Sequence, residues 1–144
     1  MTLLDAYALV ALVGDEPAAE DVEAILRGGD AGVVIVNLAE AIDVSERVHG
    51  LPAGEVRAAL EPLLLGRVLS AVASAENHAW LAGELRAKHF DKKDSALSMA
   101  DCFLLAHALA DGELVATSDP ALAKIARKQD IEVVTLPDSA GKRP

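Results

Sequence analysis

Several kinds of residue are scarce in this sequence of 144 residues. Aromatic residues make up only 3% of it, so the core has to be built from aliphatic side chains, which favours helices packed on a parallel sheet. Cys102 is the only cysteine, which excludes an internal disulfide and fits a reducing compartment, so we expect a cytoplasmic protein. No apolar run approaches the roughly 20 residues of a membrane helix, and no secretory signal is visible, so we expect no membrane partner.

Positive charge is also scarce, and it is unevenly placed. The formal net charge is −10, with 14 acidic and 4 basic residues in the range 1–85 and 9 of each in the range 86–144. A protein that coats nucleic acid by charge alone has the opposite balance. The acidity is instead typical of cation binding, of a basic protein partner or of solubility, and solubility is enough to explain the acids scattered over helix surfaces.

Short apolar runs alternate with segments of helical periodicity along the whole chain, whose length suits one domain. We expect strands over 2–4, 32–36, 114–117 and 132–135, and a short strand or a turn within 66–73. Helices are expected over 6–13, 17–27, 38–49, 75–88 and 99–111, with two more that begin at 52 and 120. This alternation predicts a three-layer α/β/α sandwich with a mainly parallel central sheet over 1–136, followed by a flexible tail over 137–144.

Four acids stand near the starts of predicted helices: Asp5, Glu40, Asp101 and Asp119. Asp5 directly follows a strand and Asp119 lies two residues after one, at positions where an aspartate often caps the next helix. Glu40 lies three residues after Asn37, and Asp101 three residues after Ser98, which is the spacing of a capping box. Taken one at a time, each acid is explained better by helix capping than by catalysis.

Taken together, the same four acids favour a site. In an open α/β sheet, strands lead into helices at the carboxyl edge, and ligands bind along that edge. Asp5, Glu40 and Asp119 each follow a strand, and the helix near Asp101 is expected to start at the same edge. Carboxylates gathered in one cleft repel each other unless cations neutralise them. Mg²⁺ or Mn²⁺ suits such oxygen ligands and promotes attack of water on a phosphate, so phosphodiester hydrolysis is the expected reaction.

Four stretches resemble the successive motifs of PIN domains: L-L-D-A-Y-A-L-V-A-L-V (3–13), N-L-A-E (37–40), L-S-M-A-D-C-F-L-L-A-H-A-L-A (97–110) and L-V-A-T-S-D-P-A-L (114–122). The L-D-A-Y-A start and the compact length most resemble VapC, the toxin half of a type II toxin–antitoxin pair. The resemblance covers nearly the whole chain. It implies a magnesium-dependent endoribonuclease that forms a homodimer and is silenced by a small antitoxin, which sends a segment into the active-site groove.

The resemblance also implies roles for single residues. It makes Asp5, Glu40, Asp101 and Asp119 the catalytic, metal-binding acids of the family, in that order. Thr117 matches a hydroxyl residue that supports the last acid, although a β-branched residue at a strand end needs no such role. Ser118 departs from the pattern, because many relatives have a basic residue there, and this puts one phosphate contact in doubt.

The remaining polar residues carry weaker signals. Four basic residues just before the Asp101 helix are the best candidates for contacting RNA, although a solvated charged loop explains them better: Arg86, Lys88, Lys92 and Lys93. The four histidines have no zinc-type spacing, so we expect them to be structural or exposed. Cys102 lies on an apolar helix face with no base near it in sequence, which predicts a core residue rather than a nucleophile.

Two further functions compete with an RNA-cleaving toxin. The same acids can serve a housekeeping PIN nuclease that has no antitoxin, or the chain can be a catalytically silent interaction module; the latter is disfavoured because no acid is missing. A receiver-type phosphoacceptor is also disfavoured, because there is no acidic pair after the first strand. For self-association we expect an apolar face made by Val56, Leu60, Leu63 and Leu64, and we expect Trp80 to face inward.

Overall fold

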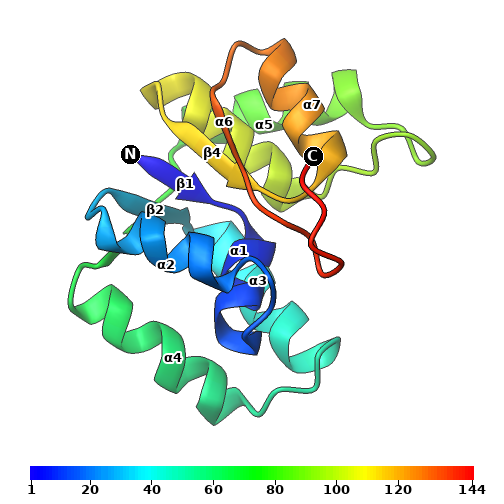
Figure 1. The fold of residues 1–144 in the computed structure, drawn as a ribbon. Coiled ribbons are helices and arrows are strands. Elements are labelled where there is room, and N and C mark those ends of the chain that lie inside the picture. The colour runs from blue at the N-terminus through cyan, green and yellow to red at the C-terminus, as the bar shows by residue number, and fades with distance from the viewer.

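The strands of this protein are only three or four residues long, and four of the five are followed by a helix after no more than three residues. The computed structural model describes all residues, 1–144 (Figure 1). Its elements are β1 Thr2–Leu4, α1 Ala6–Gly14, α2 Ala19–Arg27, β2 Ala31–Val34, α3 Ile35–Arg47, α4 Ala53–Leu65, β3 Leu69–Val72, α5 Glu76–His89, α6 Met99–Asp111, β4 Leu114–Thr117, α7 Pro120–Lys128 and β5 Val133–Thr135. The five strands form one sheet in the order β3-β2-β1-β4-β5, and every neighbouring pair is parallel.

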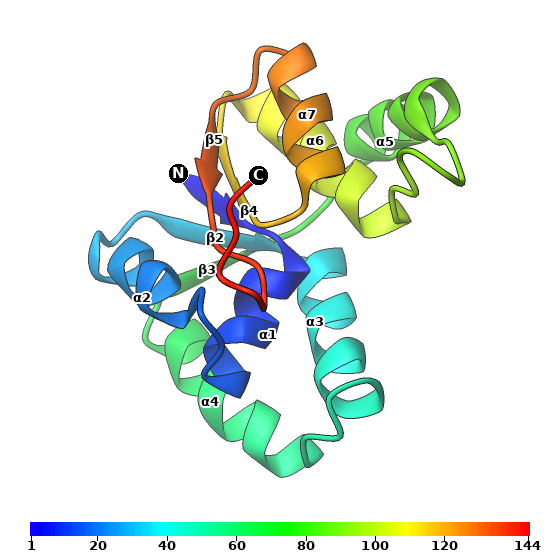
Figure 2. The same cartoon turned by 45° about the vertical axis from the view of Figure 1, so that its right-hand side comes forward.

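Helices cover both faces of this sheet, as the sequence predicts. Helices α5, α6 and α7 lie on one side, and α1, α2 and α4 lie on the other (Figures 1 and 2). Side chains alternate along a strand, so Leu3 of β1 packs into the cluster with α5, α6 and α7, whereas Leu4 packs into the cluster with α1 and α2. The predicted three-layer sandwich with a parallel sheet is confirmed.

The junction between β2 and α3 corrects one prediction. The strand expected over 32–36 ends at Val34, which is extended (φ −68°, ψ 137°), and α3 begins at Ile35. Asn37 is therefore not an N-cap: it lies fully buried inside α3, and its side-chain amide has no hydrogen-bond partner. Pairing with β3 extends only as far as Val34–Val72, so the strand propensity of the next two β-branched residues is overridden by tertiary structure.

Two expectations about helix faces are also wrong. Trp80 is 69% exposed, because the buried face of α5 runs through His78, Ala82 and Leu85, and the indole N–H donates to Glu76 at the surface. Val56 and Leu60 of α4 are 1% and 3% exposed and belong to the core cluster of α1, so they are unavailable as an external dimer face.

An edge strand and the segment after β5 complete the fold. The ambiguous segment 66–73 contains β3, an edge strand. After β5, Leu136 is buried, and Arg143 pairs with Asp21 at 2.7 Å and donates to the Thr135 carbonyl. No helix has both the length and the apolar character that crossing a membrane requires.

Candidate active site

The four acids singled out in the sequence surround one pocket of about 190 Å³ at the carboxyl edge of the sheet. Asp5 follows β1, Glu40 lies in α3, Asp101 lies in the first turn of α6, and Asp119 follows β4. The structure therefore brings together side chains that are as much as 114 positions apart in the sequence. We call these four residues the acidic quartet.

Asp5 is the most deeply placed member of the acidic quartet. It is 4% exposed, and its Oδ1 accepts a hydrogen bond of 2.7 Å from the Ala8 N–H at the start of α1. Burial raises the pKa of Asp5 to about 7, and the charges of Asp101 and Asp119 act in the same direction. Hydrogen bonds from Thr117 and from the Ala8 N–H oppose this rise in pKa without cancelling it.

Asp101 and Glu40 are linked through one hydroxyl group. Ser98 is the N-cap of α6: its Oγ accepts from the Asp101 N–H at 3.0 Å, and Asp101 Oδ2 accepts from the Ser98 N–H at 2.8 Å, which completes a capping box. The Ser98 hydroxyl also lies close enough to the Glu40 carboxylate to favour its ionised form. Burial raises the pKa values of both acids; the charge of Asp119 adds to this for Asp101, and the charge of Asp101 adds to it for Glu40.

Asp119 is the exposed member, and Thr117 connects it to Asp5. Asp119 Oδ1 caps α7 by accepting from the N–H groups of Ala121 at 2.7 Å and Leu122 at 3.3 Å. Thr117 is fully buried, and its Oγ1 accepts from the Asp119 N–H at 3.0 Å. Its hydroxyl also lies close enough to the Asp5 carboxylate to favour its ionised form, so Thr117 influences two acids.

Helix capping and a shared pocket coexist at these positions. Asp5, Asp101 and Asp119 each accept backbone N–H groups with one carboxylate oxygen. The second oxygen of each carboxylate accepts no backbone N–H and is available to a ligand. Glu40 accepts no backbone N–H, because α3 begins at Ile35 and Asn37 is not its cap. Capping alone therefore leaves Glu40 unexplained, and it does not account for four acids around one pocket.

Sequence reasoning missed two residues of this site. Tyr7 lines the pocket and donates its hydroxyl to Glu16; burial, this hydrogen bond and nearby acids raise its pKa. The double contact of Ser98, with Asp101 and with Glu40, was also missed, because only its role as an N-cap is visible in sequence. The signal for Tyr7 was its place two residues after Asp5, which puts it in the first turn of α1.

The basic residues expected to contact RNA lie outside the pocket. Arg86 is half-buried: its Nε donates to the Leu97 carbonyl at 3.4 Å, and its guanidinium lies 4.6 Å from the centre of the Phe90 ring. Lys88, Lys92 and Lys93 are exposed around the segment that leads into α6. None of these four side chains lines the pocket. They lie at the end of α5 and in the segment that leads into α6, the helix that carries Asp101.

Cys102 is fully buried, as predicted for a core residue. Burial and the neighbouring Asp101 charge raise the pKa of its thiol to about 11, so a thiolate is disfavoured at neutral pH. A cysteine nucleophile is therefore not part of this site.

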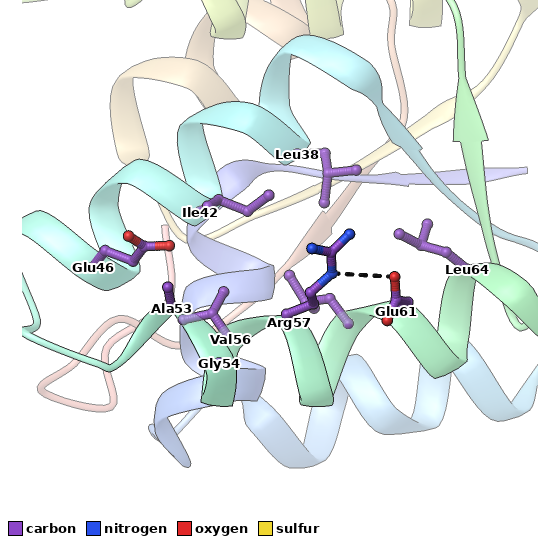
Figure 3. Close-up of a pocket in the computed structure, with 10 residues that line it drawn as sticks. Leu38, Ile42, Glu46, Ala53, Gly54, Val56, Arg57, Glu61 and Leu64 are labelled. Atoms are coloured by element: carbon purple, nitrogen blue, oxygen red, sulfur yellow. Dashed lines mark hydrogen bonds and ion pairs between the residues drawn. The ribbon is translucent and has the colours of Figure 1, made fainter.

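A larger groove of about 570 Å³ runs between α3 and α4 (Figure 3). Leu38, Ile42 and Glu46 of α3 lie along one side of it, and α4 contributes an ion pair between Arg57 and Glu61 at 3.2 Å. Six of its ten lining residues are hydrophobic, which distinguishes it from the acidic pocket. Helix α3 borders both cavities, since Glu40 lines the pocket while Leu38 and Ile42 line the groove.

Comparison with known proteins gives a family model and a set of similar structures. The model of the PIN domain matches residues 2–128. VapBC2 from Rickettsia felis, crystallised with a DNA fragment from its promoter, is similar over 92% of this chain and 96% of that chain, with 17% identity and a TM-score of 0.64. A toxin–antitoxin complex from Klebsiella pneumoniae is similar over 94% of this chain and 97% of that chain, with 17% identity and a TM-score of 0.62.

FitAcB from Neisseria gonorrhoeae is similar over 92% of this chain and 96% of that chain, with 22% identity and a TM-score of 0.59. At such identities these structures show a shared fold. No protein with a curated description matches the sequence.

Proposed function

The chain belongs to the PIN domain family, and from this premise we propose that it is a magnesium-dependent endoribonuclease, the toxin of a type II toxin–antitoxin pair. The observation that carries the proposal is that the four carboxylates of the acidic quartet surround one pocket, where burial and neighbouring charges both disfavour ionisation of Asp5, Glu40 and Asp101. The charge of Asp101 raises the pKa values of Asp5 and Glu40, and the charge of Asp119 raises those of Asp5 and Asp101. Such an arrangement is unfavourable in a purely structural cluster and favourable in a cation site.

The donor chemistry of the pocket fits Mg²⁺ or Mn²⁺. Its four acidic side chains present carboxylate oxygens, and these hard ligands suit such ions, while the Tyr7 hydroxyl that also lines it donates to Glu16. Asp5, Glu40, Asp101 and Asp119 would hold the cation, which when bound supplies positive charge that favours attack of water on a phosphodiester. Because Asp5 has a pKa of about 7, it is partly protonated at neutral pH, and cation binding should release that proton.

Several other residues would hold the acids in place during catalysis. Thr117 accepts from the Asp119 N–H and lies close to Asp5, and Ser98 accepts from the Asp101 N–H and lies close to Glu40. Their hydrogen bonds leave each carboxylate fewer orientations, so less reorganisation is needed when charge develops on the substrate. Tyr7 closes the apolar side of the pocket together with Val10 and Val44.

An RNA substrate would reach the site along the surface near α6. The exposed amines of Lys88, Lys92 and Lys93 lie around the segment before α6, whose first turn carries Asp101. Phosphates attracted there would approach the acidic pocket without competing for the quartet itself. Triple replacement of these lysines by alanine should raise the KM for RNA more than it lowers kcat.

The antitoxin proposal rests on the structural relatives, of which one is a toxin–antitoxin complex and one is VapBC2. The groove between α3 and α4 offers an apolar surface for such a partner (Figure 3). Ile42 is 38% exposed on its wall, so an apolar helix could cover it and lie next to Glu40 of the acidic pocket. Replacing Ile42 by glutamate should weaken the binding of this partner and should leave RNA cleavage intact.

The decisive experiment measures cleavage of single-stranded RNA by purified protein with and without Mg²⁺, in the wild type and in Asp101→Asn. We expect cleavage that requires the metal and that the substitution abolishes. The matched control is Asp130→Asn, which removes the same charge from an exposed residue with a positive φ of 59°, a conformation that asparagine tolerates well. Full activity of Asp101→Asn would refute the site, and metal-independent cleavage would refute the metal.

The toxin role needs a separate test in cells. Induced expression of the wild type in a bacterial host should arrest growth, whereas Asp101→Asn should not. Co-expression of a small gene adjacent to that of this chain should restore growth. Metal-dependent cleavage without growth arrest would instead identify a housekeeping nuclease of the same family.

A further inference from the structure

A second cluster of ligand-type side chains lies where the start of α5 meets the end of α6. His78 is in the first turn of α5, His107 is one turn before the end of α6, and Asp111 is the last residue of α6. The two imidazole rings stack with their centroids 3.7 Å apart and an angle of 19° between the ring planes. The histidines are 29 positions apart, so no zinc-type spacing reveals the cluster in the sequence.

Both histidines have a buried ring nitrogen that lacks a hydrogen-bond partner. These atoms are His78 Nε2 and His107 Nδ1, in residues that are 8% and 1% exposed. They lie 3.7 Å and 3.6 Å from the same atom, Oδ2 of Asp111, which is too far for a hydrogen bond. Buried polar atoms are rarely left unpaired, so two of them around one carboxylate oxygen require an explanation.

We propose that these three residues form a binding site for a transition-metal ion of the zinc type. The three ligand atoms lie within 4.8 Å of one another. In a tetrahedral zinc site with bonds of about 2.0–2.2 Å, ligand atoms lie about 3.4 Å apart, so both distances to Asp111 need to shorten only slightly. The two stacked rings would also have to turn, because an imidazole binds a metal in its own ring plane. Two imidazoles and one carboxylate match zinc-type ions, whose sites often keep a fourth position for water.

The environment of His107 favours this role. Its Nε2 lies 3.0 Å from the Ser74 hydroxyl, and donation from Nε2–H to Ser74 leaves Nδ1 free to bind a cation. Burial is the main cause that lowers the pKa of His107, which favours the neutral ring that a cation can bind. The side chain of Asp111 is half-exposed and gives an ion access from solvent.

His78 has to change its protonation for the same purpose. Its Nδ1 accepts a hydrogen bond of 3.0 Å from the Ala75 N–H, so in a neutral ring the proton lies on Nε2. Cation binding at Nε2 moves this proton to Nδ1 and breaks the contact with Ala75. The site therefore has a spectroscopic signature: the His78 ring nitrogens exchange protonation, and the Ala75 amide signal shifts.

This second site differs from the acidic pocket in its position and in the kind of metal ion that its ligand atoms suit. Asp101 and Asp111 are ten residues apart on α6, which corresponds to about 15 Å along a helix axis. The acidic pocket offers oxygen ligands alone, whereas this cluster offers two nitrogens and one oxygen. The proposal does not depend on nuclease activity. A bound ion would tie the beginning of α5 to the end of α6.

The test is calorimetric titration of chelator-treated protein with Zn²⁺ in an excess of Mg²⁺ that occupies the acidic pocket. We expect one Zn²⁺ per chain, and an affinity that falls at least about tenfold in Asp111→Asn. This substitution is suitable because Asp111 is exposed and caps nothing, so the fold should survive. Asp130→Asn serves as the matched control and should bind as the wild type does.

Nuclear magnetic resonance of the histidine ring nitrogens provides the second measurement. Zn²⁺ should change the signals of His78 and His107 and the amide of Ala75, and it should leave those of His89 unchanged. Equal affinity in the wild type and Asp111→Asn would overturn the proposal, as would unchanged ring signals. Loss of Zn²⁺ binding in Asp5→Asn but not in Asp111→Asn would place the ion in the acidic pocket and would also overturn it.

Discussion

Removing the negative charge of Asp5 should stabilise the metal-free protein while it destroys metal binding. Burial raises the pKa of Asp5 from 3.8 to about 7, which means that ionising this carboxyl in the folded state is disfavoured by about 4 kcal/mol. In Asp5→Asn the group is never charged, and asparagine still caps α1 by accepting from the Ala8 N–H. At about pH 8 the variant should gain up to about 4 kcal/mol in free energy of unfolding, less whatever contact with Thr117 is lost.

The sign of the pH dependence follows from the raised pKa. The folded protein holds the proton of Asp5 more tightly than the unfolded chain does, so the unfolded state binds fewer protons between about pH 4 and 7. Stability from this group is therefore complete below about pH 4 and is lost as the pH rises to about 7. Comparing the variant with the wild type at each pH cancels groups that both proteins share.

Urea unfolding in the presence of a chelator, at about pH 5 and about pH 8, measures this difference. The gap between Asp5→Asn and the wild type should grow by roughly 3 kcal/mol from the lower to the higher pH. Mg²⁺ should reverse the order by stabilising only the wild type. A gap that does not change with pH would refute the raised pKa of Asp5, and equal stabilisation of both proteins by Mg²⁺ would refute its role as a ligand.

Other substitutions test the remaining parts of the structure. Ser98→Ala removes the N-cap of α6 and the support of Asp101, so it should lower stability by about 1 kcal/mol and should reduce RNA cleavage more than that loss of fold explains. Leu60→Ala should cost about 2–5 kcal/mol in thermal or urea unfolding because the residue is 3% exposed, whereas Trp80→Ala, at 69% exposure, should change stability by less than about 1 kcal/mol. In sedimentation experiments at micromolar concentration we expect a homodimer, and a monomeric mass would contradict this prediction.

The sheet and its flanking helices were predictable because their signals are local. Runs of valine and leucine mark β2 and β4, and Asp119-Pro120 and Gly112 mark helix boundaries that the structure confirms. The start of α3 was not predictable, because Ile35 and Val36 favour a strand by propensity, and only the end of the β2–β3 pairing turns the chain into a helix. Boundaries fixed by a neighbouring strand are invisible in a single sequence.

The acids of the pocket were predictable by position, and their environment was not. The carboxyl edge of a parallel sheet gathers residues that follow strands, which anticipates Asp5 and Asp119. Asp5 is 4% exposed whereas Asp119 is exposed, and this difference depends on how α3 and α6 pack. The proximity of the Ser98 hydroxyl to Glu40 depends on the same packing. The pairing of His78 with His107 has the same origin, since it arises only when α5 lies against α6.

The double use of aspartate at the helix starts has a consequence for how this protein can change over generations. One base substitution converts an aspartate codon to an asparagine codon, and asparagine caps a helix about as well. At Asp5 and Asp119 such a change would delete a negative charge from the pocket without removing the caps of α1 and α7. If the acidic quartet is the catalytic site that we propose, activity can therefore be lost in one step while the chain still folds and keeps the surfaces outside the pocket.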